Sequence, residues 1–138
     1  MRNTDLAADY IHRAAIRLRA LDVLYEAESW ADVVRESQEI VELSLKALLR
    51  ARGIDPPRMH DVSGVLVAER HRLPQALAGE IENLTAISRG LRRDRDLAFY
   101  GAEDLTPSGF YSHADAEQAR TGARRTVELV TPHVKTGA

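Results

Sequence analysis

Cysteine is absent from this 138-residue sequence, and its absence excludes several kinds of chemistry. A chain without cysteine forms no disulfide, holds no thiolate-bound metal and has no cysteine nucleophile. Nothing in this composition calls for an oxidising compartment. The sequence therefore suits the reducing cytoplasm, where we expect the protein to reside.

Long apolar runs are also missing. The first ten residues, MRNTDLAADY, lack the apolar core of a signal peptide, and no segment approaches the roughly 20 apolar residues of a membrane-spanning helix. Neither sign of charge dominates, because 19 basic and 21 acidic residues leave a net charge of -2. We expect no membrane partner, and binding to nucleic acid would need a local basic patch.

Glycine-rich motifs and strand patterns are absent as well. The eight glycines are scattered, so the chain has no phosphate-binding loop of the glycine-rich type and no glycine-serine-glycine nucleophile elbow. No segment shows the alternating pattern of a half-buried strand. We therefore expect neither strands nor a cofactor.

Apolar residues instead recur every three or four positions along most of the chain, which predicts amphipathic helices. A composition of 44% hydrophobic and 29% charged residues is typical of a folded helical protein. We predict a single all-α domain over residues 1–138, built as an up-down bundle of four to five helices. The predicted helices cover residues 4–28, 30–53, 62–70, 75–96 or beyond, and 112–130.

Several helix ends carry recognisable signals. Ser29 is the expected N-cap of the second helix, and Gly53 is its expected C′ residue. Ser112, followed three residues later by Asp115, matches a capping box that opens the last helix. Between residues 101 and 111, proline and glycine predict an irregular connection.

Five residues are candidate metal ligands. His60, Asp61 and His71 could form a site with support from His12 or His113. Their spacing matches no ligand motif, and we predict that His60 or Asp61 caps the third helix while the other histidines lie at the surface. We therefore assign no metal.

Lys46 lies between apolar neighbours on the second helix. Glu42 precedes it by four residues, a spacing that brings the two side chains together on one helix face. We predict an intrahelical ion pair between Glu42 and Lys46.

Arginines crowd the end of the fourth predicted helix, where acidic residues alternate with them. Cations in the last turn of a helix favour the negative end of its dipole, which would give these arginines a structural role. Arginine forks also match phosphate geometry and need no metal, which predicts a phosphate- or RNA-binding site. Both interpretations stay open for this set: Arg89, Arg92, Arg93 and Arg95.

Four segments, taken in order, resemble a HEPN domain protein over nearly the whole chain: ADYIHRAAIRLRAL, SQEIVELSLKALLRARGIDPP, LRRDRDLAFYG and YSHADAEQA. The most specific parts are residues 39–49, the spacing from Gly53 and Pro57 to His60-Asp61, and the order of five helices. The resemblance implies a long helical hairpin completed by further helices. It also implies a homodimer in which motif residues of the two protomers face one another.

The resemblance also implies a ribonuclease motif, from which this sequence departs at one position. Many HEPN proteins are metal-independent ribonucleases and toxins, with a motif of arginine, four to six residues and histidine, often followed by any residue and tyrosine. In this sequence Arg93 takes the arginine position, Tyr100 the tyrosine position, and Ala98 stands where the histidine would be. The arginine would stabilise phosphate charge and the histidine would assist attack by the ribose 2′-hydroxyl. Alanine has no proton to exchange, which argues against ribonuclease activity.

Three functions follow from this resemblance. The first is the HEPN component of a toxin-antitoxin-like module with a nucleotidyltransferase partner that neutralises it, in some members by modifying the motif tyrosine, which is Tyr100 here. The second is a non-catalytic dimer that binds a nucleotide or RNA through Arg92, Arg93 and Arg95. The third is an unusual ribonuclease that uses Tyr100 or His113 for proton transfer. It ranks last because tyrosine, with an ordinary pKa of about 10, is a poor base near neutral pH.

Overall fold

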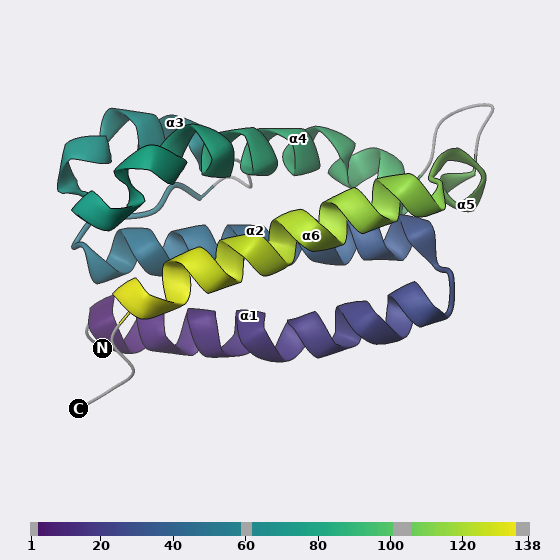
Figure 1. Cartoon of the computed structure of the whole chain (residues 1–138), viewed down its shortest axis with the longest axis horizontal. Coiled ribbons are helices and arrows are strands. Elements are labelled where there is room, and N and C mark those ends of the chain that lie inside the picture. Colours follow the sequence, from purple (N-terminus) through teal and green to yellow (C-terminus); the bar gives the residue numbers. More distant parts are fainter. Residues whose placement is uncertain (1–2, 59–61, 101–105, 135–138) are drawn as a thin grey trace.

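The computed structural model describes residues 3–58, 62–100 and 106–134, including the side chains of all of these except residues 92–100. Every regular element in this part of the chain is helical. Successive long helices run in opposite directions (Figure 1), which confirms the predicted all-α bundle. The four long helices are α1 (Asn3–Glu26), α2 (Trp30–Ala51), α4 (Ile81–Tyr100) and α6 (His113–Val130).

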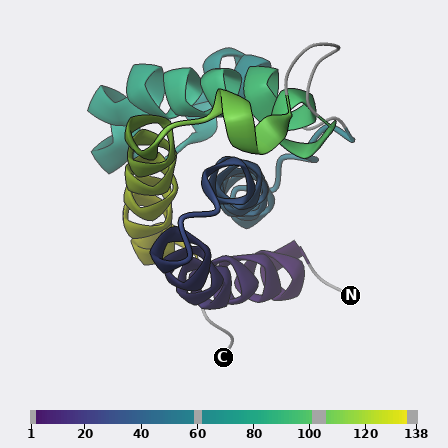
Figure 2. The same ribbon diagram turned by 90° about the vertical axis from the view of Figure 1, so that its right-hand side faces the viewer.

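The α2 helix forms the centre of the bundle. Figure 2 shows it nearly end-on, with α1, α4 and α6 arranged around it, and it contacts all three. More than half of its residues are buried, and each large apolar side chain removed from water contributes about 1.5–3 kcal/mol. The core is therefore organised around α2, whose fully buried large residues are Val33, Val34, Ile40, Val41, Leu45, Leu48 and Leu49.

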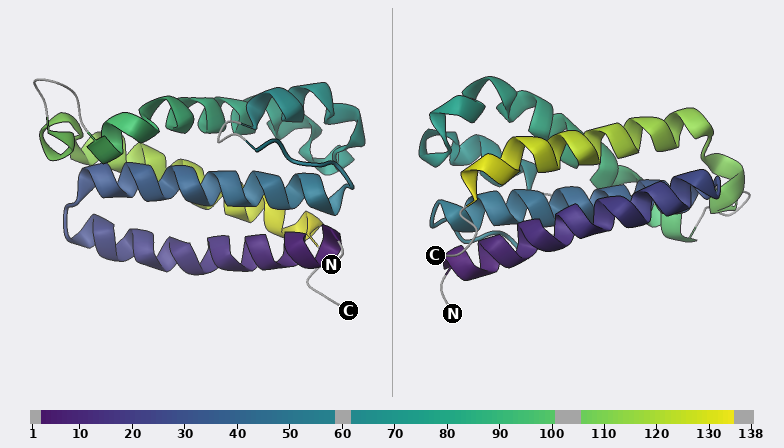
Figure 3. Two further views of the ribbon diagram at one scale, coloured as in Figure 1. Left: turned by 180° about the vertical axis from the view of Figure 1, so that it is seen from behind. Right: turned by 60° about the horizontal axis from the view of Figure 1, so that its bottom comes forward.

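The α1 and α2 helices lie side by side along their whole length (Figure 3) and are also joined by charge. Arg17 of α1 donates to the carboxylates of Glu36 at 2.6 Å and Glu39 at 2.7 Å on α2. Partial burial disfavours the charged guanidinium, but the hydrogen bonds and charges of the two glutamates outweigh it and raise the pKa of Arg17. The hairpin therefore keeps this cation charged.

The end of α2 confirms the prediction for Gly53. Its φ of 72° lies in the left-handed region, which glycine adopts without strain. The Gly53 N–H donates to the carbonyl of Arg50 at 3.0 Å, and the Ile54 N–H donates to that of Leu49 at 2.9 Å. These two bonds form a Schellman motif, and Ile54 is buried beneath it.

Two predicted N-caps behave differently. Ser112 forms the predicted capping box, because its Oγ accepts from the Asp115 N–H at 3.3 Å and its own N–H donates to Asp115 Oδ2 at 2.9 Å. Ser29 occupies the N-cap position of α2, but its hydroxyl donates to the Asp32 carboxylate at 2.6 Å and caps no backbone group. The position of Ser29 is confirmed, whereas its expected capping bond is not formed.

The region between α2 and α4 is less regular than predicted. The third helix, α3 (Ser63–Ala68), is shorter than expected and is followed by a 3₁₀ turn at Arg70–Arg72. Residues Gln75–Glu80, expected to open the fourth helix, form a second 3₁₀ segment after Pro74. Pro74, which precedes this segment, and Gly79, a poor helix former, favour the more tightly wound 3₁₀ conformation here. At its other end α4 continues beyond Asp96, as the prediction allowed, to Tyr100.

One helical turn, α5 (Pro107–Phe110), lies within the connection that was predicted to be irregular. The Thr106 Oγ1 accepts from the Gly109 N–H at 3.0 Å, and Pro107 stands at the first helical position, which suits its fixed φ. No helix in the described part of the chain is both long and apolar enough to cross a membrane.

Candidate functional site

The arginine segment belongs to the C-terminal half of α4. Arg89 is exposed and forms no ion pair within the described part of the chain. For the other predicted site residues the structure gives backbone positions on α4, while their side chains lie outside the described part: Arg92, Arg93, Arg95, Ala98 and Tyr100.

The helix dipole does not account for these arginines. Because α4 extends to Tyr100, its last turn contains no basic residue. The interaction of a cation with the dipole falls off beyond the last turn, and Arg92 and Arg93 lie about two turns from the end. The interpretation that placed them in a last turn is therefore wrong.

Helical register relates these positions to the described half of α4. Arg93 lies four residues after exposed Arg89, and Tyr100 lies seven after Arg93, so their backbone positions share one face of the helix. Ala98 lies seven residues after buried Leu91, a spacing that returns its backbone position to the core-facing side. The arginine and tyrosine positions of the motif thus share a face from which the Ala98 position is displaced.

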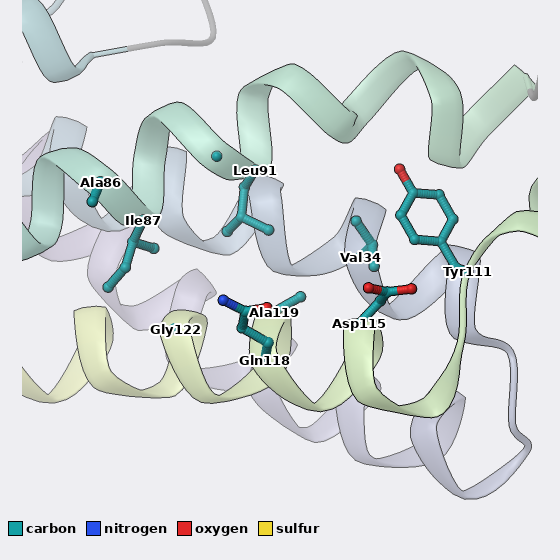
Figure 4. Close-up of a pocket in the computed structure, with 10 residues that line it drawn as sticks. Val34, Ala86, Ile87, Leu91, Tyr111, Asp115, Gln118, Ala119 and Gly122 are labelled. Carbon is teal, nitrogen blue, oxygen red and sulfur yellow. The ribbon is translucent and has the colours of Figure 1, made fainter.

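A cavity of about 170 Å³ opens between α4 and α6, immediately before the arginine segment (Figure 4). Gly90 and Leu91 line it, and Arg92 is the next residue along the helix. Sequence reasoning did not identify this site. The cavity is lined by Val34, Ala86, Ile87, Gly90, Leu91, Tyr111, Asp115, Gln118, Ala119 and Gly122.

Each of the two facing helices contributes a glycine to the cavity wall, and only Gly122 lies at a close approach of the helices. A Cβ atom built on Gly122 of α6 would lie 3.2 Å from Cγ2 of Ile87 on α4, so the helices touch closely at this point. A Cβ atom on Gly90 would meet nothing within 4 Å. Glycine inside a helix is a weak sequence signal of close packing or of a site, and it is the signal that could have indicated this cavity.

The rim of the cavity is polar and its floor is apolar. Asp115 is fixed at the rim because its Oδ2 accepts from both the N–H and the hydroxyl of Ser112, at 2.9 and 3.0 Å. Figure 4 places Tyr111 beside Asp115 at one end of the cavity, with Gln118 further along α6. A small group with both apolar and polar parts fits such a lining.

An aromatic cluster joins α6 to the hairpin turn at the same end of the bundle. The Nε2 of His113 lies 2.5 Å from the hydroxyl of Tyr25, and the Trp30 ring lies 5.1 Å from the His113 ring. The Arg120 guanidinium stacks over Tyr25, 3.7 Å from the ring centroid. His113, predicted to be a surface histidine and considered as a proton-transfer group, thus uses one ring nitrogen to fasten α6 to α1.

The arginines of α6 are already paired. Arg120 and Arg124 both contact Asp22 Oδ1, at 3.3 and 2.7 Å, and Arg125 contacts Glu80 at 3.0 Å. Compensated cations attract phosphate less than free ones. Because no described side chain forms an ion pair with Arg89, α4 is the better candidate for anion binding.

The remaining predictions concern Lys46 and the histidines. Lys46 contacts Glu42 at 3.2 Å, which confirms the predicted ion pair. His60 and Asp61 lie outside the described residues, and exposed His71 lies in the 3₁₀ turn after α3. Among the described side chains, no three acidic or histidine residues are grouped so as to hold a metal ion.

Comparison with known proteins identifies the family. The model of the HEPN domain matches residues 7–133, which includes α1, α2, α4 and α6 almost entirely. Searches of curated proteins and of solved structures found no significant match. Because the family model covers most of the sequence and the fold is the helical bundle that the resemblance implied, this chain belongs to the HEPN domain family.

Proposed function

We propose that this HEPN domain protein binds a nucleotide or RNA phosphates through the arginines of α4. The observation that carries the proposal is the placement of Arg92 and Arg93. They stand too far from the end of α4 for a dipole role, and they directly follow the residues that line the cavity. Guanidinium groups in this position would bind the phosphate of a ligand whose other part occupies the cavity.

The cavity sets the size of the attached group. Its volume of about 170 Å³ is below the roughly 300–1,000 Å³ of pockets that enclose drug-sized ligands. It would hold one flat group such as a nucleobase, with sugar and phosphate directed along α4. Binding would then combine burial of the base with charge-assisted hydrogen bonds to phosphate.

Ala98 makes binding without cleavage the better proposal. Its methyl group exchanges no proton, and His113, the alternative proton-transfer group, already shares its Nε2 with Tyr25. We propose that the protein acts as one component of a toxin-antitoxin-like pair. Its partner would be a nucleotidyltransferase, with Tyr100 as the position that the partner modifies.

Titration of ATP and of a short fluorescent single-stranded RNA tests the binding proposal. Arg93→Ala should weaken binding about tenfold or more, because a lost charge-assisted hydrogen bond costs about 1.5–3 kcal/mol. Arg58→Ala is the matched control, since Arg58 is exposed and lies outside the helices. Equal losses in the two variants would show that only net charge matters and would refute a site on α4.

An RNA cleavage assay with the same variants tests the choice between binding and catalysis. We expect little or no cleavage by the wild type. A measurable rate that Arg93→Ala abolishes would replace the binding proposal with a ribonuclease. Ala98→His restores a histidine at the motif position, and a gain of cleavage in this variant alone would support loss of an ancestral activity.

The partner proposal has its own test. Expression of the protein should arrest growth, and coexpression of a nucleotidyltransferase encoded beside it should relieve the arrest. The mass of the protein should then rise by a nucleotidyl group in the wild type but not in Tyr100→Phe. If growth recovers while the mass of the protein stays unchanged, the nucleotidyltransferase is still the partner but it does not modify Tyr100.

A further inference from the structure

Two polar side chains of α6 lie on the same wall of the cavity between α4 and α6. Asp115 and Gln118 are three residues apart, so they share one helix face with their Cβ atoms roughly 5–6 Å from each other. In Figure 4 the carboxylate of Asp115 and the amide of Gln118 both extend from α6 toward α4. A single small ligand in the cavity can therefore contact both groups.

The fold uses only one oxygen of the Asp115 carboxylate. Oδ2 accepts from the N–H and the hydroxyl of Ser112 at 2.9 and 3.0 Å, which fills the two acceptor positions of that oxygen. Within the described part of the chain Oδ1 accepts no hydrogen bond, and the Asp115 side chain is exposed. Ser112 thus holds the carboxylate in place and leaves Oδ1 as an acceptor for a ligand.

The amide of Gln118 is also available to a ligand. Gln118 is exposed and forms no hydrogen bond within the described residues. An amide offers two N–H donors and one carbonyl acceptor, whereas a carboxylate only accepts. The cavity wall therefore presents a negatively charged acceptor at Asp115 beside a donor at Gln118.

We propose that the cavity selects guanine, with the carboxylate of Asp115 accepting from N1–H and the 2-amino group of the base and with Gln118 donating to O6. This inference rests on the proposed nucleotide or RNA site and names the base that the site takes. Guanine carries two adjacent donors on one edge, followed by the O6 acceptor. That order of donors and acceptor is complementary to the two side chains.

The other bases match Asp115 less well. Adenine and cytosine each place a ring-nitrogen lone pair beside the amino group, and this lone pair would face the negative carboxylate. Uracil has a single N–H between two carbonyl oxygens, which the carboxylate also repels. A mismatched polar group that is buried without a partner costs more than the lost hydrogen bond is worth. Asp115 therefore selects guanine largely by rejecting the alternatives.

The remaining walls suit the faces and the exit of such a base. Ile87 and Leu91 of α4 and Ala119 of α6 supply apolar contacts, while the missing side chain of Gly90 leaves room beside them. Arg93 follows Gly90 by three residues, so its backbone position lies on the same side of α4. A phosphate that leaves the cavity past Gly90 is therefore directed toward the arginine segment.

Calorimetric titration of GTP, inosine triphosphate and ATP tests the choice of base, because inosine triphosphate differs from GTP only in lacking the 2-amino group. GTP should bind about tenfold or more tightly than either of the others. A short uridine-rich RNA with one guanosine should show the same preference over its inosine counterpart. Equal affinities would overturn the selection of guanine and leave the nucleotide site standing. Failure to bind any of these nucleotides or RNAs would overturn the proposed function, and this inference with it.

Variants of the two side chains test the assignment. Asp115→Asn keeps a carbonyl that can accept from the Ser112 N–H but removes the charge, so the preference for GTP over inosine triphosphate should fall to about twofold or less. Gln118→Glu lies outside the capping box and sets a carboxylate against O6, so it should weaken GTP about tenfold and ATP, whose 6-amino group donates, much less.

Glu128→Gln is the matched control for Asp115→Asn. Glu128 is exposed on α6 and lies outside the cavity, and its substitution removes the same charge. The control should alter the affinities for all three nucleotides equally and keep the preference for GTP. A preference that survives both Asp115→Asn and Gln118→Glu, or one that Glu128→Gln reduces as much as Asp115→Asn does, would show that these side chains do not read the base.

Discussion

Gly90 and Gly122 line one cavity from opposite helices, yet alanine should affect them in opposite ways. Glycine inside a helix is about 0.5–1 kcal/mol less favourable than alanine. At Gly90 a methyl group meets nothing within 4 Å, so Gly90→Ala should raise the free energy of unfolding by about that amount. At Gly122 the methyl group would press on Ile87, and overpacking costs about 1–3 kcal/mol. Gly122→Ala should therefore lower the free energy of unfolding, as measured by urea denaturation.

The two variants control each other, because each makes the same chemical change inside a helix. If Gly122→Ala stabilised the protein as much as Gly90→Ala, the close approach of α4 and α6 at Ile87 would be wrong. A larger side chain at Gly90, such as leucine, would enter the cavity itself. Gly90→Leu should therefore abolish nucleotide or RNA binding if the cavity holds the base.

At the scale of elements, the start of α6 depends on the Ser112 capping box. Replacing an N-cap serine by alanine costs about 0.5–2 kcal/mol, whereas glycine costs only a few tenths. Ser112→Ala should thus lower the free energy of unfolding by about 1 kcal/mol, and Ser112→Gly by much less. Urea unfolding of the two variants measures the difference. Equal losses would mean that the hydroxyl bonds to Asp115 do not stabilise the helix.

The helices could be predicted from the sequence because burial of one helix face places apolar residues at every third or fourth position. The predicted cap at Gly53 was confirmed for an equally local reason, since a left-handed residue after α2 calls for glycine. Local sequence signals did not predict the structure where two backbone conformations have similar free energies. Residues 75–80 carry helical periodicity, but their bonding is 3₁₀, and Thr106 caps a single turn in a segment rich in turn residues. Periodicity does not separate these alternatives.

At the scale of the whole molecule, the candidate site was only partly predictable. The arginine motif is contiguous in the sequence, so a family resemblance could single it out. The cavity beside it requires α4 and α6 to meet, and the glycines inside these helices are only a weak sequence signal of that meeting. The surface of α1 is a similar case. Buried Ile11 and exposed Ile16 are alike in the sequence, and only the packed bundle distinguishes core from surface.

The homodimer that the family resemblance implies predicts that self-association and ligand binding are coupled. If the motif residues of two protomers face one another, the arginine positions of both α4 helices surround one shared ligand. Binding of RNA should then be cooperative over the range of protein concentration in which the dimer forms, and Arg93→Ala should weaken it throughout that range. Ultracentrifugation and RNA titration over the same concentrations give the comparison. An RNA affinity that is the same for monomer and dimer would show that each protomer binds its ligand alone.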